Sequence, residues 1–252
     1  MRADVRLERP VLAAGGEHDL HCMLELEAPP PPGAARRLPL HVALVLDRSG
    51  SMEGEKLEVA LACARSLIRR LRPRDRLALV TYDHEVELRV PLGPADPLRP
   101  EMALAGVSPG WGTNLAGGWL RGAEALRAVP SGRGPRKVLL LTDGRANVGI
   151  TDPEAIVALA RRAGDDGIGT STVGFGADVD EVLLTRMADA GGGNAYLAET
   201  PGDAPGIFAA EFGDLVQLVA RDVSVEIRPA EGVRVVGVGH DDPVVAAAQG
   251  VR

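Results

Sequence analysis

Five side chains with oxygen atoms stand in three short segments that are far apart in the sequence. Asp47, Ser49 and Ser51 form an Asp-x-Ser-x-Ser pattern, which places one carboxylate and two hydroxyls on one loop. Thr113 follows a glycine in a second segment, and Asp143 stands in a Thr-Asp-Gly triplet in a third. These loops contain no histidine or cysteine. Such ligands suit Mg²⁺, Mn²⁺ or Ca²⁺ rather than zinc or copper.

The segments before two of these loops predict strands that could bring the carboxylates together. Residues 40–46 (LHVALVL) and 137–142 (KVLLLT) are largely apolar, which is typical of parallel strands covered on both faces. Asp47 and Asp143 directly follow them. Ligands of open parallel sheets bind beyond the carboxyl ends of the strands. If the two strands are neighbours, both carboxylates lie at one edge and balance the charge of a divalent ion.

The rest of the central region alternates between helical and strand patterns. We predict an α/β fold, a doubly wound and mostly parallel sheet with helices on both faces, because this alternation requires right-handed crossovers. An edge strand at 86–90 is expected to form a hairpin through Asp83-His84-Glu85, with these charges exposed. Asp178 is expected to cap one helix. For Trp111 two placements stay open, one in the core and one at the rim of the loops. The expected helices cover residues 55–71, 97–105, 115–129, 152–163, 178–188 and 203–219, and further strands cover 76–82, 168–174 and 194–198.

The two ends of the chain have a different pattern. Apolar residues alternate over 19–27 and again over 223–238 around a Pro-Ala-Glu-Gly turn, as in antiparallel strands with one covered face. Four prolines at 29–32 cannot continue a sheet and mark a boundary. We therefore predict a domain at residues 38–219, and an accessory β unit built from residues 1–37 and 220–252.

Composition excludes several classes of protein. The 252 residues carry a formal net charge of −7, so the positive field that a nucleic-acid partner requires is missing. No apolar run is long enough to span a bilayer, and the first residues lack a signal-peptide core, so a cytoplasmic location is expected. Cys22 and Cys63 are predicted to be small buried side chains, because they lie on the apolar sides of a strand pattern and a helical pattern. One pair so far apart makes neither a disulfide framework nor a metal motif.

The loop residues together resemble a known family. Asp-x-Ser-x-Ser after a buried strand, a distant Gly-Thr, and Thr-Asp-Gly after another buried strand are similar to the metal-ion-dependent adhesion site (MIDAS) of von Willebrand factor type A (VWA) domains. The resemblance covers roughly residues 40–219, and residues 142–149 (TDGRANVG) look particularly like bacterial members. The flanking strands resemble a β appendage of some of those proteins. The resemblance implies a complete metal site, made of Asp47, Ser49, Ser51, Thr113 and Asp143.

The resemblance also implies a mechanism. Ser49, Ser51 and Thr113 would touch the metal directly, Asp47 and Asp143 would often act through water, and a Glu or Asp carboxylate of a partner protein would take the open coordination position. The chain is therefore expected to bind a protein rather than to catalyse a reaction. Related proteins are often associated with MoxR-type AAA+ ATPases, which makes such an assembly a candidate partner by analogy.

Two alternatives stay open at this point. A Mg²⁺-dependent phosphohydrolase could use Asp47 as its nucleophile, as haloacid-dehalogenase-like enzymes use an Asp after the first buried strand. Those enzymes usually need a second Asp two residues later, where this chain has Ser49, and a catalytic Lys, which is not evident near the loops. In the other alternative the metal only rigidifies the loops of a structural domain.

Overall fold

The computed structural model divides the chain into two compact units, residues 33–217 and residues 1–32 together with 218–252. It describes residues 2–9, 11, 16–27, 38–130, 132–144, 146–176, 179–200, 203, 206–207, 209–211, 225–237, 246–247 and 250–251. The domain boundaries predicted at residues 38 and 219 stay a proposal. The proline run and the end of the last predicted helix fall within residues 28–37 and 212–224, which lie outside the described set.

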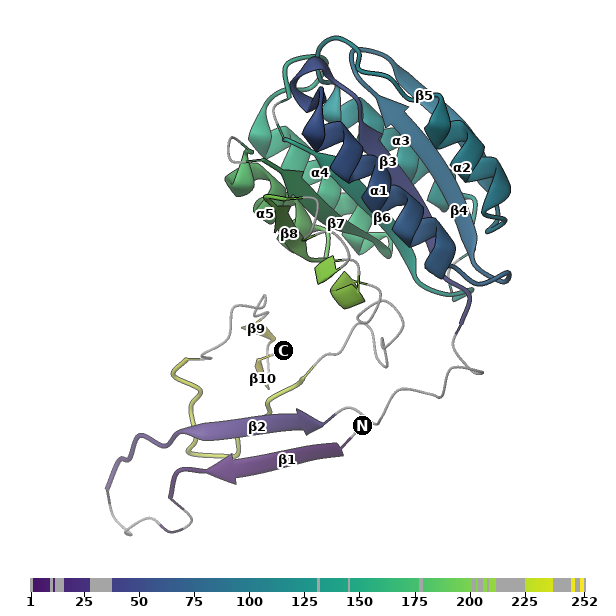
Figure 1. Ribbon diagram of the computed structural model, residues 1–252. Helices are drawn as coiled ribbons and strands as arrows, with labels where there is room; N and C mark the ends of the chain where they lie inside the picture. The colour runs from purple at the N-terminus through teal and green to yellow at the C-terminus, as the bar shows by residue number, and fades with distance from the viewer. Residues whose placement is uncertain are drawn as a thin grey trace. The chain divides into compact units, whose positions relative to one another are not determined.

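The larger unit is built on a six-stranded sheet with the order β5-β4-β3-β6-β7-β8 (Figure 1). Every neighbouring pair is parallel except β4 and β5, which are antiparallel. This arrangement confirms the predicted α/β class and places β3 beside β6, as the proposed meeting of Asp47 and Asp143 requires. The strands are β3 (His41–Asp47), β4 (Arg76–Tyr82), β5 (Val86–Pro94), β6 (Arg136–Thr142), β7 (Ile168–Phe175) and β8 (Ala195–Ala198).

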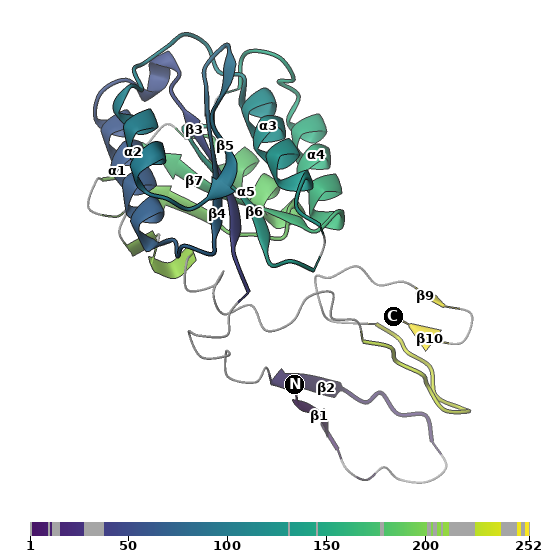
Figure 2. The same ribbon diagram turned by 90° about the vertical axis from the view of Figure 1, so that its right-hand side faces the viewer.

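Helices cover both faces of this sheet (Figure 2). One core packs α1 and α2 against one face, where Leu44 and Leu46 of β3 point. The other core packs α3, α4 and α5 against the opposite face, where Ala43 and Val45 point. All seven residues of β3 are buried, which explains its almost continuous apolar sequence. The helices are α1 (Glu55–Arg70), α2 (Leu98–Ala105), α3 (Leu115–Arg127), α4 (Pro153–Asp165) and α5 (Glu181–Ala190).

The ends of two helices differ from the prediction. The cap of α5 is Asp180, whose side chain accepts a hydrogen bond from the Leu183 backbone N–H at 3.1 Å, so the predicted cap at Asp178 is wrong. Asp178 itself lies outside the described residues. Of the last predicted helix, residues 203, 206, 207 and 209–211 are described: residue 203 is in a turn, and the others are helical.

The smaller unit contains an antiparallel pair, β1 (Arg2–Leu7) and β2 (Cys22–Glu27), and a short second pair, β9 (Ala246–Ala247) and β10 (Gly250–Val251). The prediction that the strand at 19–27 has one covered face is wrong, because every residue of β2 is exposed. Cys22 is accordingly exposed rather than buried, whereas Cys63 is buried in α1 as predicted.

The predicted hairpin near the C-terminus is described over residues 225–237, which contain one isolated β-bridge residue, Ile227, and no regular strand, so the predicted strands are wrong over these residues. The Val233 N–H donates to the Ala230 carbonyl at 3.0 Å, which forms the expected turn. Val223 and Val238, the ends of that hairpin, lie outside the described residues.

A membrane-spanning helix would need about 20 consecutive, mostly apolar residues. Among the described residues, no helix has the length and apolar character to cross a bilayer.

Candidate metal centre

The first loop of the site begins where β3 ends. Asp47 is fully buried, and both of its carboxylate oxygens accept hydrogen bonds: Oδ1 from the Ser49 N–H at 2.8 Å and Oδ2 from the Thr142 hydroxyl at 2.6 Å. A single 3₁₀ turn at Gly50–Met52 then carries the chain toward α1. The Ser49 and Ser51 hydroxyl oxygens are 3.1 Å apart. Asp47 therefore shapes the loop that presents the two serine hydroxyls.

The second carboxylate comes from the neighbouring strand β6. Asp143 is fully buried directly after Thr142, the residue whose hydroxyl contacts Asp47. Its Oδ1 makes no hydrogen bond within the described part of the chain. Its Oδ2 lies 3.5 Å from Nζ of Lys56, at the start of α1. A buried carboxylate oxygen without a partner is unfavourable and marks a place where a cation would be stabilised.

Hydrogen bonds from backbone N–H groups join the loop of Thr113 to the other two loops. The Gly110 N–H donates to the Arg48 carbonyl at 2.7 Å, next to Asp47. The Thr113 N–H donates to the Asn147 side-chain oxygen at 2.8 Å, in the loop that follows Asp143. Thr113 is buried at this junction. The structure therefore brings all three predicted segments to the same end of the sheet, and Asn147 is a positioning residue that the sequence interpretation did not identify.

Burial also changes the acidity of the site. Desolvation raises the pKa of Asp47 from 3.8 to about 6, against the hydrogen bonds from Thr142 and Ser49, which lower it, and the nearby charge of Asp143 adds to the rise. Desolvation likewise raises the pKa of the neighbouring Tyr82 hydroxyl well above its usual value. Without a metal ion, a negative charge on Asp47 is therefore costly at neutral pH.

A buried carboxylate supports the loops from behind, and here the sequence interpretation was wrong. Asp83 was expected to be an exposed turn residue, but only 1% of it is accessible. Its carboxylate accepts hydrogen bonds from the backbone N–H groups of Glu85 at 2.8 Å and Trp111 at 3.3 Å, and pairs with Arg48 at 3.0 Å. A side chain at Gly110 would overlap this carboxylate, which explains the glycine there. Asp83 thus fixes the first two loops relative to each other.

The rim of the site carries an unusually exposed aromatic residue. Trp111, two residues before Thr113, is 81% exposed, which excludes the core placement and leaves the rim placement. The second tryptophan, Trp119 in α3, is buried and donates its ring N–H to the Thr170 hydroxyl at 3.1 Å. Large exposed aromatic side chains are typical of binding surfaces.

The donor set fits a hard divalent cation. No group of three or more His, Cys, Asp or Glu side chains that could hold a metal exists in the part of the chain that is described, so zinc-type coordination has no support there. The cluster instead combines two buried carboxylates, one with an unpartnered oxygen, with hydroxyl oxygens. That chemistry suits Mg²⁺, Mn²⁺ or Ca²⁺. The residues that would hold the ion are Asp47, Ser49, Ser51, Thr113 and Asp143.

The structure gives one observation for the phosphohydrolase alternative and one against it. The expectation that no lysine stands near the loops is wrong, because Lys56 contacts Asp143. Asp47, however, is a poor nucleophile in this setting. It is fully buried, and both of its oxygens are occupied by hydrogen bonds from Ser49 and Thr142. Attack on a substrate would require this scaffold to break.

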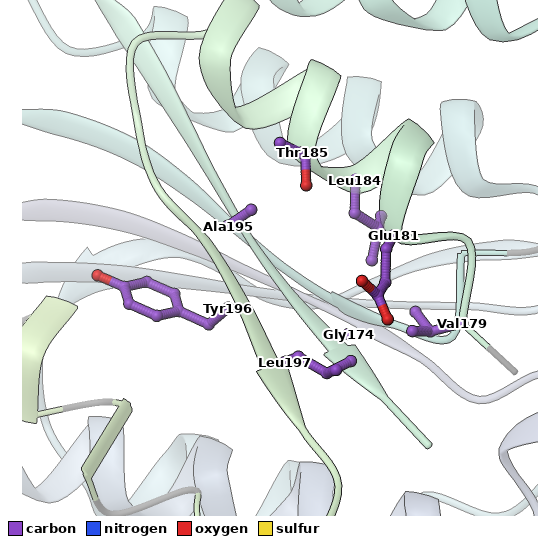
Figure 3. Close-up of a pocket in the computed structure, with 8 residues that line it drawn as sticks. All are labelled: Gly174, Val179, Glu181, Leu184, Thr185, Ala195, Tyr196 and Leu197. Atoms are coloured by element: carbon purple, nitrogen blue, oxygen red, sulfur yellow. The ribbon is translucent and has the colours of Figure 1, made fainter. Parts of the chain in front are cut away.

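The domain has a surface pocket beside α5 (Figure 3). It lies between α5 and the edge strand β8, and its wall combines aliphatic side chains with the polar side chains of Glu181, Thr185 and Tyr196. None of the five candidate ligands lines it. Its position therefore gives no support to a substrate site at Asp47.

The sequence of this chain is similar to those of several known proteins. The chain is 29% identical over 191 residues to an uncharacterised protein, YfbK, of Escherichia coli, and 30% identical over 210 residues to an uncharacterised protein, sll0103, of Synechocystis. It is 30% identical over 199 residues to human inter-alpha-trypsin inhibitor heavy chain H4. These matches cover 74%, 80% and 75% of this chain but only 33%, 48% and 21% of the relatives. The chain thus spans less than half the length of these relatives.

Solved structures share the fold. A von Willebrand factor type A protein from Catenulispora acidiphila superposes with a TM-score of 0.62 at 22% identity, over 71% of this chain and 43% of that one. BatB from Bacteroides thetaiotaomicron superposes with a TM-score of 0.60 at 20% identity, over 70% and 98%. The family model for the von Willebrand factor type A domain matches residues 41–210, which include all five candidate ligands. The chain therefore belongs to the von Willebrand factor type A domain family.

Proposed function

We propose that this chain is a protein-binding module in which a divalent cation at the MIDAS position is completed by a carboxylate of the partner. VWA domains commonly mediate protein–protein interactions, often with a metal, and solved relatives of the fold include the VWA domain of a pilus tip protein. The observation that carries the proposal is the buried Asp143, whose Oδ1 has no described partner and whose charge acts on the buried Asp47. Mg²⁺ is the expected ion, with Mn²⁺ or Ca²⁺ as substitutes.

In this proposal the chain's own residues have distinct roles. Ser49, Ser51 and Thr113 supply neutral oxygens, so the bound ion keeps enough positive charge to attract one more carboxylate. Asp47 holds the first loop in shape through its bonds to Ser49 and Thr142. The metal supplies electrostatic attraction for an acidic side chain. The exposed Trp111 offers an apolar contact next to that acidic residue.

The binding role can be tested with immobilised protein and a cell lysate. We expect a partner that is retained in millimolar Mg²⁺, released by a chelator, and absent when Asp143→Asn replaces the wild type. Ser108→Ala is a matched control, since Ser108 is a loop hydroxyl outside the candidate ligand set. It should retain the partner. Partners that ignore both the chelator and Asp143→Asn would contradict the proposal and favour a domain whose metal is only structural.

A further inference from the structure

A lysine points at the candidate metal centre from the first turn of α1. Nζ of Lys56 lies 3.5 Å from Oδ2 of Asp143, and 23% of its side chain is exposed. The end of β7 leaves room for it: a Cβ on Gly176 would lie 2.5 Å from Cε of Lys56. Gly176 also has a φ of +86°, which other residues rarely adopt. The loop after β7 thus accommodates the lysine stem, so the placement of this charge depends on two separate elements.

The charges of the site make this position consequential. Asp47 and Asp143 are both fully buried, and Asp47 accepts a hydrogen bond from the hydroxyl of Thr142, the residue before Asp143. In the metal-free protein the Lys56 ammonium lies against Asp143. When a divalent ion arrives, it must share Asp143 with this ammonium, and two cations on one carboxylate repel each other.

We propose that Lys56 is a tethered cation that stabilises the metal-free site and lowers its affinity for the metal. This inference rests on the proposed metal-binding function and adds a means of keeping binding reversible. The fixed positive charge partly replaces the ion when the ion is absent, and opposes it when the ion is present. Lys56 thus sets the affinity without being a ligand.

The test compares Lys56→Met, which keeps a flexible stem and removes the charge, with Lys56→Arg, which keeps the charge. In Lys56→Met we expect the Mg²⁺ affinity measured by calorimetry to rise roughly tenfold. The thermal midpoint of metal-free Lys56→Met should lie roughly 2–4 °C below that of the metal-free wild type. In saturating Mg²⁺ the two proteins should have the same thermal midpoint. Lys56→Arg should keep a Mg²⁺ affinity and a metal-free thermal midpoint close to those of the wild type.

Lys137→Met is the matched control. Lys137 also pairs with a buried carboxylate, Glu211 at 3.0 Å, but it stands at the opposite end of β6 from Asp143. This variant should lose stability without any change in Mg²⁺ affinity. If Lys56→Met binds Mg²⁺ no more tightly than the wild type, the tethered-cation role is overturned while the metal site stands. If neither protein binds Mg²⁺, the proposed function falls and the inference falls with it.

Discussion

Asp47→Asn should stabilise the metal-free protein while it weakens metal binding. Asn has the same shape as Asp, and it can still accept a hydrogen bond from the Ser49 N–H and donate one to the Thr142 hydroxyl, which the aspartate now engages. It cannot ionise. Because burial raises the pKa of Asp47 to about 6, the wild type must hold an unfavourable buried charge at neutral pH that the variant avoids. Mg²⁺ affinity should fall by about 10- to 100-fold.

The stability difference between Asp47→Asn and the wild type should depend on pH. A carboxyl whose pKa is 3.8 in the unfolded chain and about 6 in the folded one binds protons more tightly when folded. Its contribution therefore lowers the free energy of unfolding as pH rises from about 4 to above 6, by up to about 3 kcal/mol at neutral pH. The variant should exceed the wild type by that amount at about pH 7 and match it at about pH 4.

Urea unfolding in metal-free buffer at both pH values measures this difference. Asp152→Asn is the matched control. Asp152 is an exposed N-cap of α4, where Asn caps as well as Asp, so this variant should change stability by less than about 1 kcal/mol. The same titration predicts that Mg²⁺ binding to the wild type weakens as pH falls through about 6, because the proton competes with the ion. If the wild type and Asp47→Asn have the same free energy of unfolding at neutral pH, the inference that Asp47 carries a costly buried charge is refuted.

Asp143→Asn should abolish metal binding without the gain in stability. This substitution removes the carboxylate that has an unpartnered oxygen, so we expect Mg²⁺ affinity to fall by at least about 100-fold. It also removes the negative charge opposite Lys56. Because Lys56 is partly exposed and stays solvated, the metal-free stability should change by less than about 1 kcal/mol.

Calorimetry and urea unfolding on the two Asp→Asn variants therefore separate two properties of one site. Both variants should lose affinity, but only Asp47→Asn should become more stable. If Asp143→Asn gained as much stability as Asp47→Asn, the charge of Asp143 would not be compensated in the metal-free protein, and the role assigned to Lys56 would be lost as well.

The sequence predicts those parts of the fold that depend on local pattern. The apolar run of β3 and the alternation of strands with helices suffice for the α/β class, and the edge strand β5 is antiparallel to β4 as expected. The position of Asp47 after β3 and of Asp143 after β6 follows from the same patterns. Their proximity requires β3 and β6 to be neighbours, which only the sheet order shows.

Features that depend on contacts between distant residues could not be predicted. Asp83 stands in a polar turn, yet its buried carboxylate contacts Arg48 and the backbone N–H of Trp111, which lies 28 positions later. Lys56 has the sequence context of an ordinary lysine at a helix start, yet it contacts Asp143, 87 positions away. Cys22 alternates with leucines as in a covered strand, but exposure depends on what covers the strand. Asp178 and Asp180 are both acceptable caps, and the path of the chain selects Asp180.

Calorimetric titration of Mg²⁺ into metal-free wild-type protein tests the central claim most directly. We predict saturable binding of one ion per chain in the micromolar to millimolar range, Mn²⁺ competing for the same site, and loss of the signal in Asp143→Asn. If the folded wild type shows no saturable binding of either ion at millimolar concentration, the five oxygen-bearing residues do not form a metal centre, and the binding surface of this chain must lie elsewhere.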